Sequence, residues 1–230
     1  MRIGGFQKNT LIDFPGEMAC LVFTPGCNLA CPYCHNPDLL DKSAPDLEIK
    51  TVFDFLKQRK GFLDGVVITG GEPCLQPNLM DFIQRIKEMG FKVKLDSNGS
   101  RPGVLTTLLE AKFLDYVAMD IKTDLPHYPE LAKGDLDVEK IQESIGLIMD
   151  RAPDYEFRTT CLAPFTTPET MEEMGKMIQG AKRYILQNCS KKVDMLDPKF
   201  METRAEFLTP EAMEELKKIA EKYVGAVSIR

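Results

Sequence analysis

The sequence predicts an α/β fold, a partial (β/α)6 TIM-like barrel of parallel strands that is open on one side. Two observations support this fold class. Six short apolar runs alternate with six stretches of helical periodicity, which implies parallel strands joined by helical crossovers. The chain of 230 residues has room for six such units rather than the eight of a closed barrel. An open doubly wound sheet is the alternative that this pattern leaves standing.

The expected strands are short runs of β-branched and apolar residues. A lead-in that looks like a short hairpin precedes them, with turn signals at Asn9-Thr10 and Pro15-Gly16. The six strands are expected at residues 20–24, 66–70, 92–96, 116–120, 156–160 and 183–187. A further short strand is expected at 225–229.

The expected helices show apolar residues at helical spacing, with start and stop signals at their ends. Gly61 and Gly90 follow the first two, and Pro102 begins the third. Residues 138–148 carry the fourth apolar stripe. The last two begin with a threonine cap and a first-turn proline, at Thr167-Pro168 and Thr209-Pro210.

Composition and charge narrow the class of protein. The chain is 43% hydrophobic and 28% charged, which is typical of a globular domain, and we expect one domain over 1–230. Its parts are a lead-in (1–18), a barrel core (19–190) and a C-terminal helix and tail (191–230). A net charge of −6 argues against nucleic acid or an anionic membrane as partner. No apolar run reaches the length of a membrane span or signal peptide, so a cytoplasmic location is expected.

Three of the seven cysteines form a cluster that predicts a metal centre. Cys27, Cys31 and Cys34 follow the first expected strand at the spacing C-x3-C-x2-C. Three thiolates would leave one iron of a [4Fe–4S] cluster open to a ligand, because such a cluster normally takes four. A structural zinc site, with His35 as fourth ligand, is the alternative that the spacing allows.

Other chemically useful residues follow the remaining strands, where functional groups of parallel α/β folds gather. The second strand ends with Gly70, Gly71 and Glu72, and the third ends with Asp96, Ser97 and Asn98. The fourth strand ends with Asp120 and Lys122, and the fifth contains Arg158. Glycines allow a ligand to approach the backbone, and the Glu72 carboxylate could accept hydrogen bonds from an ammonium group. A buried Arg158 needs an anionic partner, either a ligand carboxylate or a neighbouring acid.

Two of these motifs resemble those of one superfamily. The cysteine spacing, with Tyr33 directly before the last cysteine, resembles the signature of the radical S-adenosylmethionine (radical SAM) superfamily. The stretch Gly70-Gly71-Glu72-Pro73 looks like the loop that binds the methionine amine in that superfamily. The resemblance implies that Cys27, Cys31 and Cys34 hold a [4Fe–4S] cluster and that S-adenosyl-L-methionine binds its open iron.

Other stretches are similar to those of glycyl-radical-enzyme activating enzymes. Residues 96–99 and 120–122 resemble motifs of pyruvate formate-lyase activating enzymes. Residues 10–16 and 34–37 are similar to anaerobic ribonucleoside-triphosphate reductase activating proteins. By this resemblance Asp96 and Asp120 would hold a monovalent cation near the methionine carboxylate, which Lys122 would contact. Ser97 and Asn98 would belong to the same loop. Beside this resemblance, Arg158 is expected to reach the carboxylate or ribose or to pair with a neighbouring acid, and Tyr33 to pack on the adenine or to have an ordinary packing role.

The resemblance implies a specific reaction. Reductive cleavage of S-adenosylmethionine gives a 5′-deoxyadenosyl radical, which installs a glycyl radical on a partner enzyme. The expected partner is anaerobic ribonucleotide reductase, with a flavodoxin- or ferredoxin-type electron donor, and no catalytic side chain is expected beyond the cluster and cofactor. A small-molecule or peptide-modifying radical SAM enzyme, similar to 7-carboxy-7-deazaguanine synthase, is the first alternative. A zinc-stabilised binding protein without catalysis is the second.

Overall fold

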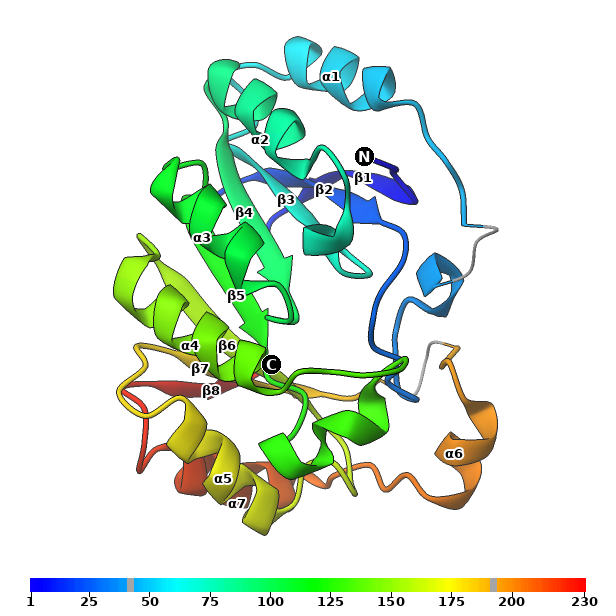
Figure 1. The fold of residues 1–230 in the computed structure, drawn as a ribbon, viewed down its shortest axis with the longest axis vertical. Helices are drawn as coiled ribbons and strands as arrows, with labels where there is room; N and C mark the ends of the chain where they lie inside the picture. The colour runs from blue at the N-terminus through cyan, green and yellow to red at the C-terminus, as the bar shows by residue number, and fades with distance from the viewer. Residues whose placement is uncertain (41–43, 191–193) are drawn as a thin grey trace.

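A computed structural model describes residues 1–40, 44–190 and 194–230 of the chain, and its strands form one eight-stranded sheet (Figure 1). The strands are β1 Gly5–Thr10, β2 Ala19–Thr24, β3 Gly65–Gly70, β4 Lys92–Ser97, β5 Tyr116–Asp120, β6 Tyr155–Cys161, β7 Tyr184–Asn188 and β8 Val227–Ile229. The antiparallel pair β1 and β2 is the predicted lead-in hairpin. The six predicted central strands are β2 to β7, each within a residue or two of its expected bounds.

The strand order decides between the two predicted architectures. The strands lie side by side in their order along the chain, from β1 to β8, and β2 to β8 are parallel. A doubly wound sheet would reverse direction at a switch point, whereas here every crossover advances the same way. The partial barrel is therefore confirmed. Because β1 and β8 are the two ends of this order, the barrel has an open side between them.

The helices lie on the outer face of the curved sheet, except the short α6, which lies apart from them (Figure 1). They are α1 Ile49–Gln58, α2 Leu79–Glu88, α3 Pro102–Glu110, α4 Glu139–Arg151, α5 Pro168–Met177, α6 Pro198–Thr203 and α7 Pro210–Ala220, with 3-10 turns η1 Pro37–Leu40, η2 Pro73–Leu75 and η3 Leu125–Leu131. The predicted caps are present, since Thr167 accepts the amide of Thr170 and Thr209 that of Ala212. The short α6 has no apolar stripe of its own and was missed by the periodicity.

The core of the sheet has two parts because strand residues alternate between its two faces, and a third apolar cluster, with Tyr33, Phe165 and Phe200, lies around the cysteine loop. The larger part lies between the strands and the helices and includes Val66, Ile68 and Val93. The smaller part fills the bottom of the barrel with Phe14, Leu21 and other side chains. Above this apolar floor, the carboxyl ends of the strands carry the polar groups described below.

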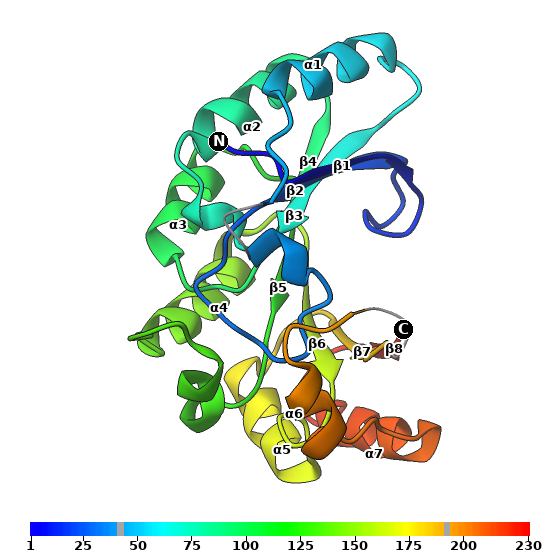
Figure 2. The same ribbon diagram turned by 90° about the vertical axis from the view of Figure 1, so that its right-hand side faces the viewer.

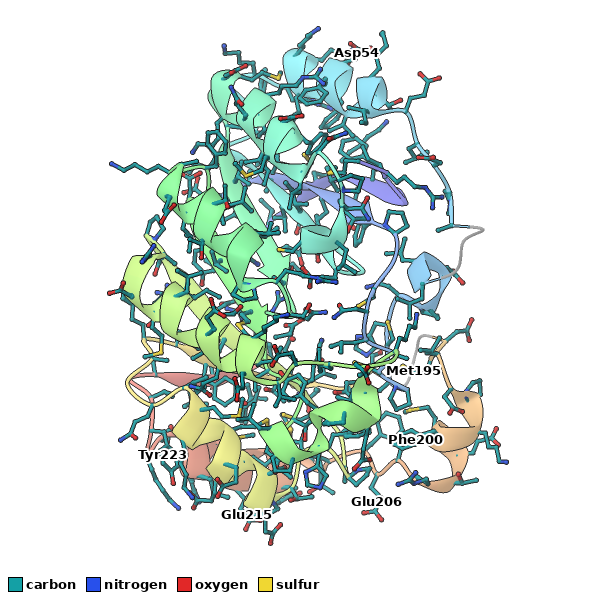
Figure 3. The ribbon with its side chains drawn as sticks, in the orientation of Figure 1. Asp54, Met195, Phe200, Glu206, Glu215 and Tyr223 are labelled. Carbon is teal, nitrogen blue, oxygen red and sulfur yellow. The ribbon has the colours of Figure 1, made fainter. Side chains whose placement is uncertain are left out.

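The C-terminal segment completes the barrel rather than trailing from it. Its strand β8 pairs with β7, and α7 packs beside α5. Earlier in the same segment, α6 covers the cysteine loop. The amide of Asp197 donates to the Pro32 carbonyl (3.1 Å), and the Phe200 ring stacks on the Phe165 ring (5.7 Å between centroids). Figure 3 shows Met195 and Phe200 at this place. No helix in the described part of the chain is long and apolar enough to cross a membrane.

Candidate active site

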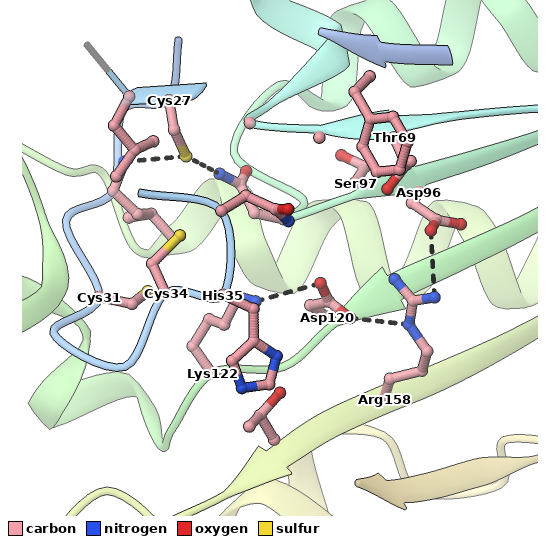
Figure 4. A pocket seen from close by; sticks show the side chains of 18 of the residues that line it. Cys27, Cys31, Cys34, His35, Thr69, Asp96, Ser97, Asp120, Lys122 and Arg158 are labelled. Carbon is pink, nitrogen blue, oxygen red and sulfur yellow. Dashed lines mark hydrogen bonds and ion pairs between the residues drawn. The ribbon is translucent and has the colours of Figure 1, made fainter. Parts of the chain in front are cut away.

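A cavity of about 400 Å³ lies at the carboxyl ends of the strands (Figure 4). Its size is that of a small-molecule or cofactor site. The structure brings together in its wall all but one of the predicted site residues: Cys27, Cys31, Tyr33, Cys34, Gly70, Gly71, Asp96, Ser97, Asn98, Asp120, Lys122 and Arg158. Glu72 is the exception.

The cysteine loop is held by backbone contacts on both sides. The amide of Ala30 donates to the Leu131 carbonyl (2.7 Å), and that of Lys133 donates to the Asn28 carbonyl (2.9 Å). The Cys27 sulfur accepts the amide of Leu29 (3.4 Å) and the side-chain amide of Asn98 (3.7 Å). These contacts present the thiols to the cavity on a loop of defined shape.

The thiols fit a multi-iron cluster better than a single ion. Among the described residues, no three His, Cys, Asp or Glu side chains converge on one point as the ligands of one ion must. A [4Fe–4S] cluster bonds each thiolate to a different iron, so its ligands stand further apart. His35, the predicted fourth zinc ligand, has its Nε2 atom 3.8 Å from the sulfur of Cys189.

Burial favours the protonated thiols of Cys27 and Cys31 until a metal binds. Desolvation raises the pKa of Cys31 to about 12 and raises that of Cys27, with smaller contributions from the charges around them. A positively charged metal centre reverses this preference, because the thiolate is the ligand form. The loop therefore suits a soft, cationic centre.

Tyr33 lies under the cysteine loop and is almost fully buried. Its ring packs against Phe165 at 5.5 Å between centroids, and its hydroxyl donates to the Lys122 carbonyl (3.2 Å). The ring also lines the cavity, so the predicted adenine contact remains a prediction.

The two glycines at the end of β3 are required by the backbone that leads from β2 into the cysteine loop. A Cβ atom on Gly71 would lie 2.0 Å from the Gly26 carbonyl oxygen, and one on Gly70 would lie 2.6 Å from the Thr24 nitrogen. Gly70 also has a φ of +113°. The amide of Gly71 donates to the Thr24 carbonyl (2.8 Å). Both glycines also line the cavity, so their predicted role in admitting a ligand stays a prediction.

Glu72 lies behind the cavity wall and has no exposed surface. Its carboxylate accepts the amides of Asn98 (2.6 Å) and Cys74 (2.9 Å) and the hydroxyl of Ser97 (3.0 Å). Burial raises its pKa, and these donors oppose the rise. The carboxylate thus holds the loop after β4 in place, and in this structure it does not face the cavity as the predicted ammonium contact requires.

Asn98 and Ser97 connect that loop to the cysteines. The Asn98 side-chain amide donates to Asn28 Oδ1 (3.0 Å), and Ser97 Oγ accepts the amide of Gly99 (3.1 Å). Asn28, which the sequence analysis did not select, also accepts the hydroxyl of Ser100 (3.3 Å). The loops after β2, β3 and β4 therefore form one hydrogen-bonded wall.

Charged side chains form the opposite wall. Arg158 bridges two carboxylates, with Nε 2.8 Å from Asp120 Oδ1 and one terminal nitrogen 3.2 Å from Asp96 Oδ2. Lys122 Nζ donates to Asp120 Oδ2 (3.1 Å). Although burial opposes its ionisation, Arg158 and Lys122 hold the pKa of Asp120 well below its usual range. Burial of Lys122 lowers its pKa, but the neighbouring Asp120 carboxylate outweighs this effect and raises the pKa above its usual value.

The guanidinium of Arg158 lies where a cation shared by Asp96 and Asp120 was predicted. Of the two partners expected for Arg158, the structure shows the neighbouring acids. The predicted monovalent cation at Asp96 and Asp120 stays a prediction, and it would have to share these carboxylates with the Arg158 guanidinium.

Lys94 is a member of this network that the sequence analysis missed. It lies on β4 two residues before Asp96, its side chain is 2% exposed, and its Nζ lies 3.2 Å from Asp96 Oδ1. The signal was available, because residues i and i+2 of a strand share a face. A lysine within a central strand is itself unusual, since buried lysines need partners.

Comparisons with known proteins show the family of this chain. The model of the Radical SAM superfamily matches residues 21–179. A protein of Methanocaldococcus jannaschii, named as a proposed glycyl-radical enzyme activating enzyme, is 34% identical over 99% of this chain and 95% of its own length. The pyruvate formate-lyase-activating enzyme of Clostridium pasteurianum is 35% identical over 53% of this chain and 52% of its own length.

Solved structures share the fold at low identity. SuiB of Streptococcus suis bound to S-adenosylmethionine superposes with a TM-score of 0.64 at 14% identity, over 91% of this chain and 51% of SuiB. The anSMEcpe structure with bound AdoMet and a peptide gives a TM-score of 0.61 at 17% identity, over 92% of this chain and 63% of that one. The family match runs from β2 to α5 and includes the cysteine loop. This chain therefore belongs to the radical SAM superfamily and is an enzyme whose cofactors are a [4Fe–4S] cluster and S-adenosylmethionine.

Proposed function

We propose that this enzyme installs a glycyl radical on a partner enzyme, with anaerobic ribonucleoside-triphosphate reductase as that partner. The observation that carries the proposal is the near-full-length similarity to a protein named as a proposed activating enzyme. The choice of partner rests on the likeness of residues 10–16 and 34–37 to activating proteins of that reductase.

When bound, the cluster and S-adenosylmethionine would supply the chemistry, a reductive cleavage that yields a 5′-deoxyadenosyl radical. Cys27, Cys31 and Cys34 would hold the cluster. The chain's own contribution is to bind and orient the cofactor beside it. Asn98 would support this arrangement, because its side-chain amide contacts both Cys27 and Asn28.

The charged wall suits a ligand carboxylate. Three cationic side chains, Lys94, Lys122 and Arg158, face two carboxylates, Asp96 and Asp120. A buried ligand carboxylate needs a cationic partner, and these side chains could supply one. Lys122, which contacts Asp120 alone within this group, is the side chain best placed to receive a second anion.

The open side of the barrel suits a macromolecular substrate. The cavity is lined by Gln7 on β1 and by Gln187 on β7, which lie near the two ends of the strand order. Figure 2 shows the turn between β1 and β2 projecting from one end of the sheet, with β7 and β8 at the other. A glycine-bearing loop of a partner could enter between them. A small electron-transfer protein of the flavodoxin or ferredoxin type would reduce the cluster.

We also propose a cytoplasmic location. All seven cysteines are free thiols, and a reducing compartment keeps them so. The same compartment would protect the cluster-binding thiols from oxidation.

The proposal is tested with protein reconstituted without oxygen with iron and sulfide. The reduced protein is incubated with S-adenosylmethionine and the purified reductase, and electron paramagnetic resonance is recorded. A doublet signal on a glycine, with one 5′-deoxyadenosine formed per radical, is the expected result. Cleavage of S-adenosylmethionine without a glycyl signal on any glycyl radical enzyme of the host would favour the small-molecule or peptide-modifying alternative.

A further inference from the structure

The turn between β1 and β2 exposes two large apolar side chains on a rigid support. Leu11 is 72% exposed and Ile12 is 82% exposed. The Thr10 hydroxyl accepts the amides of Ile12 (3.2 Å) and Asp13 (3.3 Å) and also contacts the Asp13 carboxylate. Just beyond, the buried Phe14 packs on the Tyr116 ring at 6.0 Å between centroids. The exposure is therefore imposed by a defined turn, and Asp13 in this turn also lines the cavity.

A buried lysine joins this turn to the cavity. Lys94 Nζ donates to the backbone carbonyl of Asp13 and lies 3.2 Å from Asp96 Oδ1. That oxygen is buried and accepts no hydrogen bond from the described residues, so the Lys94 ammonium is its charge partner. The ammonium is also 5.6 Å from the centre of the Tyr116 ring. Lys94 thus has one contact in the turn and one in the charged wall.

The remaining contacts lead from Asp96 into the cavity. The other oxygen of Asp96 meets Arg158 at 3.2 Å, and Arg158 meets Asp120, which meets Lys122. Each link is a direct charge contact between largely buried side chains. Removing one partner of a buried ion pair leaves an uncompensated charge. A side chain that moves at one end of this series of contacts therefore destabilises the next side chain in it.

We propose that Lys94 is a positioning residue that couples the turn at Leu11 and Ile12 to the cofactor pocket. The proposal rests on the proposed role of Asp96 and Arg158 in cofactor binding. A cofactor carboxylate that pairs with Arg158 weakens the contact between Arg158 and Asp96. Asp96 then attracts the Lys94 ammonium more strongly, and this alters the contact of Lys94 with the Asp13 carbonyl. Because such coupling is reciprocal, a partner polypeptide that holds the turn would strengthen cofactor binding.

Hydrogen exchange tests the coupling without any partner enzyme. Deuterium uptake of residues 10–18 is measured by mass spectrometry in the reconstituted enzyme, with and without S-adenosylmethionine. We expect the cofactor to slow this exchange about fivefold or more, the lower end of typical couplings. Lys94→Met should remove the slowing. Lys92→Met is the matched control, because Lys92 lies on the same strand and pairs with Glu17 of the same hairpin, yet does not contact Asp96.

A double-mutant cycle keeps the proposal testable if Lys94→Met folds poorly, as judged by circular dichroism and iron content. Thr10→Val loosens the turn and should weaken S-adenosylmethionine binding about fivefold in calorimetry. In a Lys94→Arg background, Thr10→Val should change the affinity for S-adenosylmethionine by a different factor than it does in the wild type. Strict additivity, or an unchanged exchange pattern in Lys94→Met, would overturn the coupling. A wild-type enzyme that binds no S-adenosylmethionine would instead overturn the proposed cofactor site and, with it, this inference.

Discussion

Arg158 and Asp120 lie opposite each other on β6 and β5, and the guanidinium Nε is 2.8 Å from the carboxylate. Because the same guanidinium also contacts Asp96, it is the central member of the charged wall. Its planar fork can meet two carboxylates at once, which a lysine ammonium on a flexible stem does less well.

Replacing Arg158 by glutamine should weaken the binding of S-adenosylmethionine. The change leaves Asp96 and Asp120 short of a partner and removes a positive charge that a cofactor carboxylate would meet. Breaking a buried charge contact of this kind costs about 2–5 kcal/mol, so the dissociation constant should rise by about 30-fold or more. Anaerobic calorimetry measures it. Arg158→Lys, which keeps the charge, should lose less, and equal affinities in all three proteins would refute the assignment.

A monovalent cation should bind Asp96 and Asp120 only when Arg158 is absent. In the wild type, potassium chloride and tetramethylammonium chloride at equal ionic strength should give the same melting temperature. In Arg158→Gln, potassium should raise it, because the two carboxylates are then free to hold an ion. No difference between the salts in either protein would mean that these aspartates do not form a cation site.

Replacing Cys31 by alanine should abolish cluster assembly. Only three thiols of this loop are available, and the remaining two cannot hold the cluster. Iron content and the visible absorbance of the reconstituted protein measure the loss. Cys189→Ala is the control, since Cys189 lies beside His35 but outside the predicted ligand set. A brown, iron-loaded Cys31→Ala protein would contradict the ligand assignment.

Replacing Glu72 by glutamine should destabilise the fold rather than act on the cofactor alone. The side-chain NH2 group of glutamine would face one of the backbone amides that now donate to the Glu72 carboxylate. The hydrogen bonds that depend on the negative charge of this carboxylate would also be lost. We expect a loss of about 2–3 kcal/mol. In thermal unfolding this corresponds to about 4–12 °C for a chain of this size. Glu88→Gln, at the exposed end of α2, is the control and should change neither the free energy of unfolding nor the melting temperature. An unchanged melting temperature with weaker S-adenosylmethionine binding would instead support the predicted ammonium contact.

Replacing Gly71 by alanine should disturb the cysteine loop. The new methyl group would lie 2.0 Å from the Gly26 carbonyl oxygen, so the backbone before Cys27 must move. We expect a lower yield of cluster and a lower melting temperature. Gly103→Ala, in α3, meets no atom within 4 Å and should stabilise the protein by about 0.5–1 kcal/mol through helix propensity. Full cluster loading in Gly71→Ala would show that the close approach can relax.

The amino-acid sequence determined the order of strands and helices, the parallel barrel units, the cysteine loop and the candidate residues at the strand ends. These features depend on local periodicity and on spacings of a few residues. For that reason α6, which lacks an apolar stripe, escaped prediction, while the caps at Thr167 and Thr209 did not.

Tertiary structure alone decided which groups these residues contact. Asp96 and Arg158 are 62 positions apart in the sequence, so no local pattern connects them. Their contact depends on the register of β4, β5 and β6. The same holds for Glu72 with Asn98, for Gly71 with Gly26, and for Lys94 with Asp13. A buried polar group takes whatever partner the packed fold brings within reach, and no spacing along the chain specifies that partner.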